Sequence, residues 1–370
     1  MSPERRGLAD RLTGAAISLA ERALVPDAAI RLGARRLCRA RLRGEAASHR
    51  AAGPVRDGRD DAGLADPTLV ALTSGPIAMA QELANQQHYE VPVEFFHQVL
   101  GPRLKYSCCL WSSGTDDLDR AESDMLELTC ERASLVDGQQ ILELGCGWGS
   151  LTLWMARRYP NAEILAVSNS RSQRLYIEGC CRDEGLRNVE VRTADVASLE
   201  LSQHPPFDRV ISVEMFEHLR NWSALLHRIG DWLAPDGRLF LHFFCHRQFA
   251  YLYRDDGAGD WMARSFFSGG LMPSWDLLRQ IPSPLVVEQQ WKVSGRHYES
   301  TCNAWLERLD RHDEEVLRVF EDVYGEDAAA RWIQRWRLFF MACAELFGYA
   351  QGEEWMVAHA LLAPRHPTAR

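Results

Sequence analysis

The sequence predicts an α/β protein with a doubly wound, largely parallel sheet. The first observation is a βαβ pattern, in which apolar runs at 141–144 and 164–167 flank a segment with helical spacing at Leu151, Trp154 and Met155. The second is the return of short apolar runs further along, most of them separated by helical patterns. The third is the length of 370 residues, which allows one α/β core with additions.

The N-terminal segment predicts two amphipathic helices over residues 7–43, separated near Pro26. The first 50 residues carry 11 Arg and 5 acidic residues, a net charge of +6 in a chain whose total is −9. This asymmetry suits contact with an acidic partner or a membrane surface. The favoured alternative is an Arg-rich helical pair packed on the domain or on another subunit, as in a homodimer. Residues 44–66 are expected to form a linker.

Residues 85–111 interleave aromatic and polar side chains without a helix or strand period, as expected for a lid over a ligand. Tyr89 and Cys108 in this lid are candidate substrate contacts. Cys108 and its neighbour Cys109 do not have the spacing of metal ligands, so no metal site is expected. An amphipathic helix at 119–135 then leads into the core.

Three glycines occupy the turn after the first strand of the βαβ pattern: Gly145, Gly147 and Gly149. Glycine lets the backbone approach a ligand closely, beside the free N–H groups that open the next helix. The spacing is Gly-x-Gly-x-Gly, and the second strand ends in Ser168 and Asn169, so the pattern is not that of a dinucleotide site. With Glu143 just before the turn, it resembles the first motif of class I S-adenosylmethionine-dependent methyltransferases.

Further strands are predicted at 189–192, 209–213, 238–244, 285–291 and 355–361. In a doubly wound sheet, ligands lie outside the carboxyl ends of the strands. Asp195 follows the strand at 189–192. It is placed either to reach an adenine or to cap a helix before Ser198.

The strand at 209–213 runs into Glu-Met-Phe-Glu-His at 214–218. If a helix begins there, Glu214, Glu217 and His218 are related by i, i+3 and i+4 and share one face. Such a group could bind an ammonium, accept its proton and orient the nitrogen for in-line methyl transfer. The alternative is an acidic helix start on the surface, which the helix dipole favours.

Residues 85 to about 362 resemble the plant coclaurine N-methyltransferase family, which is itself similar to the cyclopropane-fatty-acyl-phospholipid synthases. The matching motifs include His-Tyr-Glu-Val-Pro from position 88, Leu-Lys-Tyr-Ser-Cys-Cys from 104, Leu-Gly-Cys-Gly-Trp-Gly-Ser from 144, Glu-Met-Phe-Glu-His from 214 and Phe-Ser-Gly-Gly-Leu-Met-Pro from 267. The resemblance implies a Rossmann-like class I methyltransferase fold, S-adenosylmethionine as cofactor and a small amine, cyclic, benzylisoquinoline-like or other, as acceptor.

The resemblance also implies roles for individual residues. The expected cofactor contacts are Tyr106, Ser107, Gly145, Gly147, Asn169, Gln173 and Asp195. Glu143, the acid just before the glycine turn, is expected to join them. The expected catalytic residues at the amine are Glu214, Glu217 and His218.

The cyclopropane synthases supply an alternative, methylene transfer to an unsaturated lipid. Their bicarbonate site resembles a set present here: Cys108, Glu217, His242 and Tyr298. Bicarbonate would act as the base that removes a proton from the carbocation. Position 214 separates the families, because cyclopropane synthases tend to have Gly there and the N-methyltransferases have Glu. A cofactor-binding protein without catalysis is a third alternative, which the retained Glu/Glu/His set disfavours.

The segment at about 295–352 has helical patterns and interrupts the sheet before its last strand, so it is expected to cap the crevice. Three of its aromatic residues are candidate substrate contacts that would stack on an aromatic amine or its cation: Trp336, Phe340 and Phe347. Core packing is the alternative for most aromatic residues of the segment.

The predicted organisation is N-terminal helices and linker at 1–66, a lid and helical extension at 67–138, and the catalytic core at 139–370. The net charge of −9 argues against general nucleic-acid binding. The ten cysteines form no Cys-x-x-Cys and no signal peptide is recognised, so a reducing, cytoplasmic location is expected. No apolar run reaches the roughly 18 residues of a membrane span.

Overall fold

The computed structural model describes residues 3–52, 67–77 and 91–365. Seven strands form the central sheet: β1 Gln140–Leu144, β2 Glu163–Ser168, β3 Val189–Thr193, β4 Phe207–Val213, β5 Leu233–His246, β8 Leu285–Val293 and β9 Trp355–Pro364. Their order is β3-β2-β1-β4-β5-β9-β8. The strands run parallel except for β9, which is antiparallel to both β5 and β8. The predicted doubly wound, largely parallel sheet is confirmed.

Every predicted strand is present, and the central strands show the clearest apolar runs. β1 and β2 are buried along nearly their whole length, and β9 is buried from Trp355 to Ala363. Continuous apolar strands of this kind need cover on both faces, which helices provide in α/β folds.

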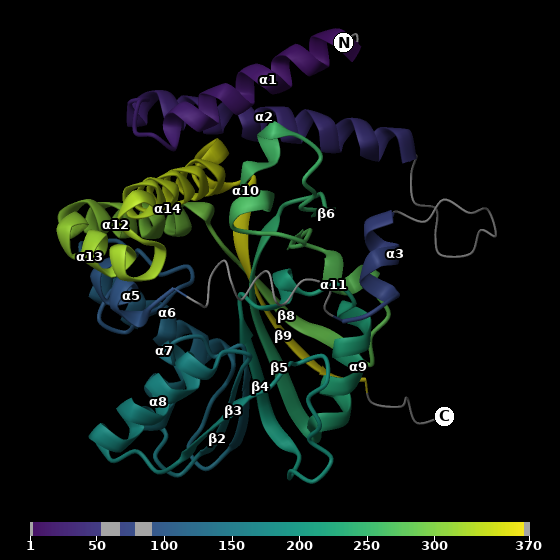
Figure 1. Cartoon of the computed structure of the whole chain (residues 1–370). Helices are drawn as coiled ribbons and strands as arrows, with labels where there is room; N and C mark the ends of the chain where they lie inside the picture. Colours follow the sequence, from purple (N-terminus) through teal and green to yellow (C-terminus); the bar gives the residue numbers. More distant parts are fainter. Residues whose placement is uncertain (1–2, 53–66, 78–90, 366–370) are drawn as a thin grey trace.

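Helices lie on both sides of the sheet (Figure 1). One side carries α6 Leu118–Arg132, α7 Ser150–Arg158 and α8 Arg171–Glu184, and the other carries α3 Pro67–Thr73, α9 Trp222–Trp232 and α11 Leu277–Gln280. The start of α6 is fixed by Asp117, whose side chain accepts a hydrogen bond from the backbone N–H of Arg120 at 2.7 Å. The predicted helix at 119–135 is confirmed.

A helical cap lies between β8 and β9, as predicted. It consists of α12 Gly295–Arg311, α13 Asp313–Tyr324 and α14 Glu326–Phe347, and it packs with α5 Val93–Val99 around a large aromatic core. Between β5 and β8 the chain also forms a small two-stranded sheet, β6 Tyr251–Leu252 with β7 Leu271–Met272, and the short helix α10 Trp261–Ser265.

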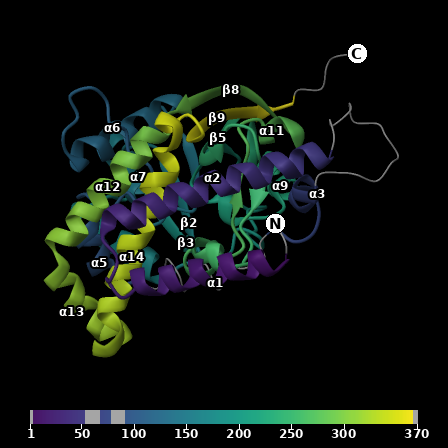
Figure 2. The ribbon, with the colours of Figure 1, turned by 90° about the horizontal axis from the view of Figure 1, so that it is seen from above.

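The N-terminal helices α1 Pro3–Ala20 and α2 Asp27–Ala52 lie across the cap (Figure 2). Glu345 of α14 accepts hydrogen bonds from Arg31 and Arg35, and Arg41 pairs with Asp260. The two helices therefore pack on the rest of the chain, which is one of the two placements expected for the Arg-rich pair. The linker predicted from residue 44 is wrong for residues 44–52, because this Ala-rich stretch has high helix propensity and continues α2. Residues 53–66 lie outside the described part of the chain.

Among residues 3–52, 67–77 and 91–365, no helix has both the length and the apolar character that crossing a membrane requires.

Candidate active site

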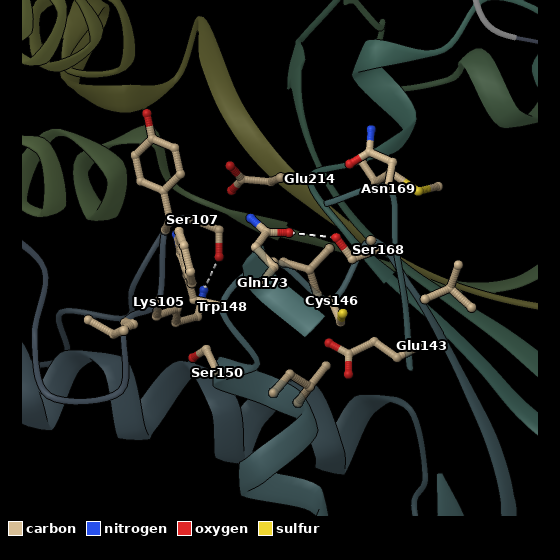
Figure 3. A pocket seen from close by; sticks show the side chains of 18 of the residues that line it. Lys105, Ser107, Glu143, Cys146, Trp148, Ser150, Ser168, Asn169, Gln173 and Glu214 are labelled. Carbon is tan, nitrogen blue, oxygen red and sulfur yellow. Dashed lines mark hydrogen bonds between the residues drawn. The ribbon is translucent and has the colours of Figure 1, made fainter. Parts of the chain in front are cut away.

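A cavity of about 140 Å³ opens at the carboxyl ends of β1, β2 and β4 (Figure 3). Its lining includes seven of the eight predicted cofactor contacts: Tyr106, Ser107, Glu143, Gly145, Gly147, Asn169 and Gln173. This is where a doubly wound sheet places its ligand. We call it the first cavity.

The three glycines of the turn between β1 and α7 all have positive φ, which side chains rarely adopt. A Cβ at Gly145 would lie 2.8 Å from Cβ of Met215, and one at Gly149 would lie 2.6 Å from Ile177. At Gly147, which lines the first cavity, an added Cβ would have no protein atom within 4 Å. Packing therefore requires two of the glycines, whereas the third leaves the cavity open.

Two amide side chains line the first cavity: Asn169 directly after β2, and Gln173 in the first turn of α8. Ser168 Oγ donates a hydrogen bond of 2.6 Å to Oε1 of Gln173 (Figure 3). Because the amide oxygen of Gln173 already accepts this bond, its NH₂ group is the part of the side chain that remains to donate a hydrogen bond to a ligand. Asn169 lies beside them in the lining, where many dinucleotide sites have an acid.

Glu143 is a buried acid at the base of the first cavity. Its side chain accepts a hydrogen bond of 2.5 Å from the hydroxyl of Thr152, and the residue is 3% exposed. Burial raises the pKa of Glu143 to about 8. A cationic ligand beside this group would therefore favour loss of its proton.

Asp195 does not belong to the lining of the first cavity, although its neighbours Ala194 and Val196 do. Its carboxylate accepts a hydrogen bond of 2.6 Å from the backbone N–H of Ala197. The carboxylate thus closes a turn, and no helix begins there. The adenine contact of Asp195 stays a prediction.

Glu214 is the first residue after β4 and has a left-handed backbone, with φ of 48°. Its carboxylate accepts hydrogen bonds from Cys108 N at 3.0 Å and Tyr298 OH at 2.6 Å, and its Oε1 lies at hydrogen-bond distance, 3.1 Å, from His242 Nε2. We call these three groups the donor cradle. A non-glycine residue in this conformation is strained, which is common at functional sites.

The helix considered at residue 214 does not form, so the condition for Glu214, Glu217 and His218 to share one face is not met. The left-handed backbone of Glu214 is followed only by a short 3₁₀ turn, η2 Phe216–His218. Glu214 and His218 line the same space, but Glu217 lines neither this cavity nor the second one described below.

Glu217 is fully buried under β5. Its Oε1 accepts a hydrogen bond of 2.7 Å from Phe244 N, and its Oε2 has no hydrogen-bond partner among the described residues. Burial, with the nearby charge of Glu214, raises the pKa of Glu217 well above its usual range. Because Glu217 lines neither cavity, its expected role at the amine becomes that of a buried neighbour of Glu214.

A second cavity of about 110 Å³ meets the first. Most of its lining is aromatic or apolar: Phe244, Tyr253, Met262, Phe267, Met272, Tyr298, Cys302, Trp305, Phe339, Cys343, Leu346 and Phe347. Three residues line both cavities: Tyr106, Glu214 and His218. The Glu214 carboxylate therefore lies at the junction of the two spaces.

The residues predicted to contact the substrate, or bicarbonate in the alternative, divide into four groups, of which the core residues Trp336 and Phe340 come last. Phe347 and Tyr298 line the second cavity and stack with ring centroids 4.3 Å apart. Cys108 and His242 line neither cavity, and each contacts Glu214, which lines both. Tyr89 lies outside the described residues.

Trp336 and Phe340 line neither cavity, so their predicted substrate contact is corrected to core packing. Trp336 is fully buried, and its ring centroid lies 4.7 Å from that of Phe95. The α14 residue Phe339 lines the second cavity instead. Sequence patterns missed Tyr253 and Met262, which come from the irregular segment between β5 and β8.

Trp336→Ala is expected to cost about 3–5 kcal/mol of unfolding free energy, because it leaves a large cavity inside the aromatic core. Denaturant titration would measure the loss. Trp332→Ala on the same helix removes a partly exposed ring and serves as the control. Equal losses in the two variants would contradict the core placement of Trp336.

Burial raises the pKa of Glu214, and the positive charge of Lys105 opposes the shift. Lys105 is itself buried, and its Nζ donates hydrogen bonds to Ser107 Oγ at 2.6 Å and to Cys108 O at 2.7 Å. A carboxylate in this setting can attract a cation and can accept a proton more readily than an exposed one.

Comparison with known proteins shows which family the chain is similar to. The family model of mycolic acid cyclopropane synthetases matches residues 78–354. (S)-Coclaurine N-methyltransferase of Thalictrum flavum subsp. glaucum is 40% identical over 295 residues, which cover 79% of this chain and 81% of that one. Cyclopropane-fatty-acyl-phospholipid synthase of Escherichia coli K12 is 29% identical over 70% of this chain and 67% of its own length.

Solved structures give the same relationship. The crystal structure of coclaurine N-methyltransferase bound to N-methylheliamine and SAH superposes with a TM-score of 0.85 at 36% identity, covering 94% of this chain and 98% of that one. The cyclopropane synthase MmaA2 of Mycobacterium tuberculosis shares the fold, with a TM-score of 0.62 at 22% identity over 77% of this chain and 99% of that one. The coclaurine N-methyltransferases are thus relatives of this chain, and the chain belongs to the mycolic acid cyclopropane synthetase family of S-adenosylmethionine-dependent methyltransferases.

Proposed function

We propose that the protein transfers a methyl group from S-adenosylmethionine to the nitrogen of a small amine that carries an aromatic ring. The observation that carries this proposal is the position of the Glu214 carboxylate. It lies where the two cavities meet, and the donor cradle holds it in place. The relatives named N-methyltransferases support the same chemistry.

The first cavity fits the cofactor. Gly147 leaves room for a nucleoside against the backbone, Gln173 and Asn169 offer amide groups, and Glu143 offers an acid for a cationic ligand. Tyr106 and Ser107 line the same cavity and are proposed to contact the cofactor as well. When bound, S-adenosylmethionine supplies an electrophilic methyl group.

The residues of the second cavity are suited to the amine. Its aromatic rings can pack against an aromatic acceptor and attract a cation over their faces. Glu214 would bind the ammonium, take its proton and leave the nitrogen lone pair free to attack. His218 and Tyr106, which line both cavities, would orient that nitrogen. Positioned proton transfer of this kind typically contributes about 10² to 10⁴ in rate.

Cyclopropane synthesis with bicarbonate remains the alternative that the family as a whole supports. In this chain, three of the groups expected to hold bicarbonate already donate to or contact Glu214: the Cys108 N–H, His242 and Tyr298. A second anion at the same place would meet the negative charge of Glu214, and like charges repel. This occupation of the donor cradle favours the amine.

Binding of tetrahydroisoquinoline to protein saturated with S-adenosylhomocysteine tests the proposal by calorimetry. We expect Glu214→Gln to weaken binding at least tenfold, because the variant lacks the charge that pairs with the ammonium. Isochroman, which has oxygen in place of the nitrogen, should bind both forms alike. Unchanged binding of the amine to Glu214→Gln would rule out Glu214 as its partner.

Cofactor binding is expected to depend on pH through Glu143. Its pKa of about 8 means that the free protein holds this proton at neutral pH. Because a cationic cofactor favours the ionised form, binding should release a proton and tighten by at most about tenfold per pH unit from about pH 5.5 to about 7.5. Calorimetry in buffers with different ionisation enthalpies measures the release. Glu143→Gln should show neither effect, and a pH-independent wild type would contradict the assignment.

The outer face of the N-terminal helices is proposed to contact an anionic membrane surface. Leu12, Leu19 and Leu32 are 63%, 46% and 48% exposed, and exposed arginines accompany them on α2. Cosedimentation with vesicles containing phosphatidylglycerol tests the contact. A concentration-dependent dimer without vesicle binding would assign the face to a second copy of the chain.

A reducing, cytoplasmic location remains part of the proposal. All ten cysteines are free in the structure, which suits such a compartment.

A further inference from the structure

A line of hydrogen bonds leads away from Glu214 through the sheet. His242 Nε2 lies 3.1 Å from Glu214 Oε1, His242 Nδ1 lies 2.9 Å from His359 Nε2, and His359 Nδ1 lies 2.8 Å from a terminal nitrogen of Arg132. The two histidines are 1% and 0% exposed. We call these four residues the donor chain.

The topology of the sheet explains this alignment. His242 on β5 and His359 on β9 are directly paired across the antiparallel strands, so their side chains leave the same face of the sheet. Trp291 on β8 is the next residue in the row, paired with His359. Arg132, the last residue of α6, lies over the Trp291 ring at 5.1 Å from its centroid.

The direction of the chain follows from its outer end. A guanidinium has only donors, so Nδ1 of His359 must accept from Arg132 and the proton of His359 must sit on Nε2. That N–H then donates to Nδ1 of His242, which places the proton of His242 on Nε2. Nε2–H of His242 therefore donates to Glu214, and every bond of the donor chain points toward the carboxylate.

The surroundings support neutral histidines in this arrangement. Burial lowers the pKa of both His242 and His359, and nearby positive charges lower it further. Arg132 is only half-buried and sits at the carboxyl end of α6, where the helix dipole favours a cation. Its charge is therefore sustained at the outer end of the chain.

We infer that Arg132 and His359 are positioning residues that fix His242 as a donor, and thereby hold the Glu214 carboxylate as an oriented anion for the amine. The inference rests on the proposed N-methyltransferase function for its catalytic consequence. Its structural part, the direction of the hydrogen bonds, can be tested without any methyl acceptor.

Other charged or titratable groups also face Glu214 and are left in place by changes at Arg132: Lys105, Glu217, His218, Tyr298, Cys108, Cys109 and Cys302. Lys105 also acts electrostatically on both histidines, and Glu131 acts on Arg132. A variant at the far end of the donor chain therefore changes its direction while the groups in contact with Glu214 stay the same.

Arg132→Glu and Arg132→Lys form the matched pair for the test. Lysine keeps a donor at the end of the chain, whereas the introduced carboxylate can only accept and should reverse every bond. In ¹⁵N NMR of histidine-labelled protein, the wild type and Arg132→Lys should show Nε2–H tautomers for His242 and His359. Arg132→Glu should show Nδ1–H tautomers, with signals assigned through His242→Gln and His359→Gln. A wild-type Nδ1–H tautomer at His242, or tautomers unchanged in Arg132→Glu, would overturn the inference.

The kinetic consequence is read from the pH profile of methyl transfer to tetrahydroisoquinoline. Reversal presents a lone pair of His242 to Glu214, so the carboxyl should hold its proton more tightly. The acid limb of kcat should move up by at least one pH unit in Arg132→Glu and stay in place in Arg132→Lys, with S-adenosylhomocysteine binding intact in both. An unchanged limb in Arg132→Glu would overturn the positioning role. If the wild type methylates no amine at all, the proposed function fails, and the tautomers still decide the direction of the chain.

Discussion

Glu214→Gly is expected to lower amine methylation by a factor of about 10² or more while leaving cofactor binding intact. The variant removes the Glu214 carboxylate, which lies at the junction of the two cavities. The backbone conformation should be kept, because φ of 48° is strained for Glu and is readily adopted by Gly. The loss should therefore appear in kcat/KM for the amine and leave circular dichroism unchanged.

The same variant leaves the donor cradle without an acceptor. The backbone N–H of Cys108, His242 Nε2 and the Tyr298 hydroxyl would then surround a space of carboxylate size. Added formate or bicarbonate should bind there and restore part of the activity. Glu214→Gln keeps the space filled and is the control that should not respond. A fully active Glu214→Gly variant, or rescue that is equal in both variants, would contradict the role assigned to the carboxylate.

Gly147→Val is expected to abolish measurable S-adenosylmethionine binding while the fold persists. An added Cβ at Gly147 meets no protein atom within 4 Å, so the new side chain projects into the space of the first cavity. The left-handed backbone adds a strain of about 1–2 kcal/mol, which a domain of ordinary stability tolerates. Calorimetry with the cofactor measures the loss of binding.

Gly185→Val is the matched control. Gly185 also has a positive φ, of 69°, and an added Cβ there also meets nothing within 4 Å, but it lies outside the lining of the first cavity. It should lose similar stability and keep cofactor affinity. Near wild-type affinity in Gly147→Val would refute the placement of the cofactor.

The strands and the glycine turn could be predicted from sequence because their signals are local. Apolar runs, helical spacing and the Gly-x-Gly-x-Gly turn each depend on neighbours within a few residues. The arrangement of Glu214, Glu217 and His218 was harder to predict. Their spacing places them on one face only if the backbone is helical. The left-handed conformation of Glu214 separates Glu217 from the cavity, and no periodic pattern encodes such a turn.

The long-range contacts of the site could not be derived from spacing. His242 and His359 meet because β9 inserts beside β5, and that pairing depends on the topology of the whole sheet. Phe339 and Trp336 on α14 show the same limit. Both are apolar aromatics at helical spacing, and only the packing of the cap decides that one faces the cavity and the other the core.

The central claim is that the methyl group goes to an amine nitrogen, and one competition reaction tests it directly. Purified protein would receive methyl-labelled S-adenosylmethionine together with tetrahydroisoquinoline and vesicles of an unsaturated phospholipid, with and without added bicarbonate. The account predicts label on the nitrogen of the amine, at a rate that does not depend on bicarbonate. Label in the lipid as a cyclopropane ring, at a rate that rises with bicarbonate, would contradict it.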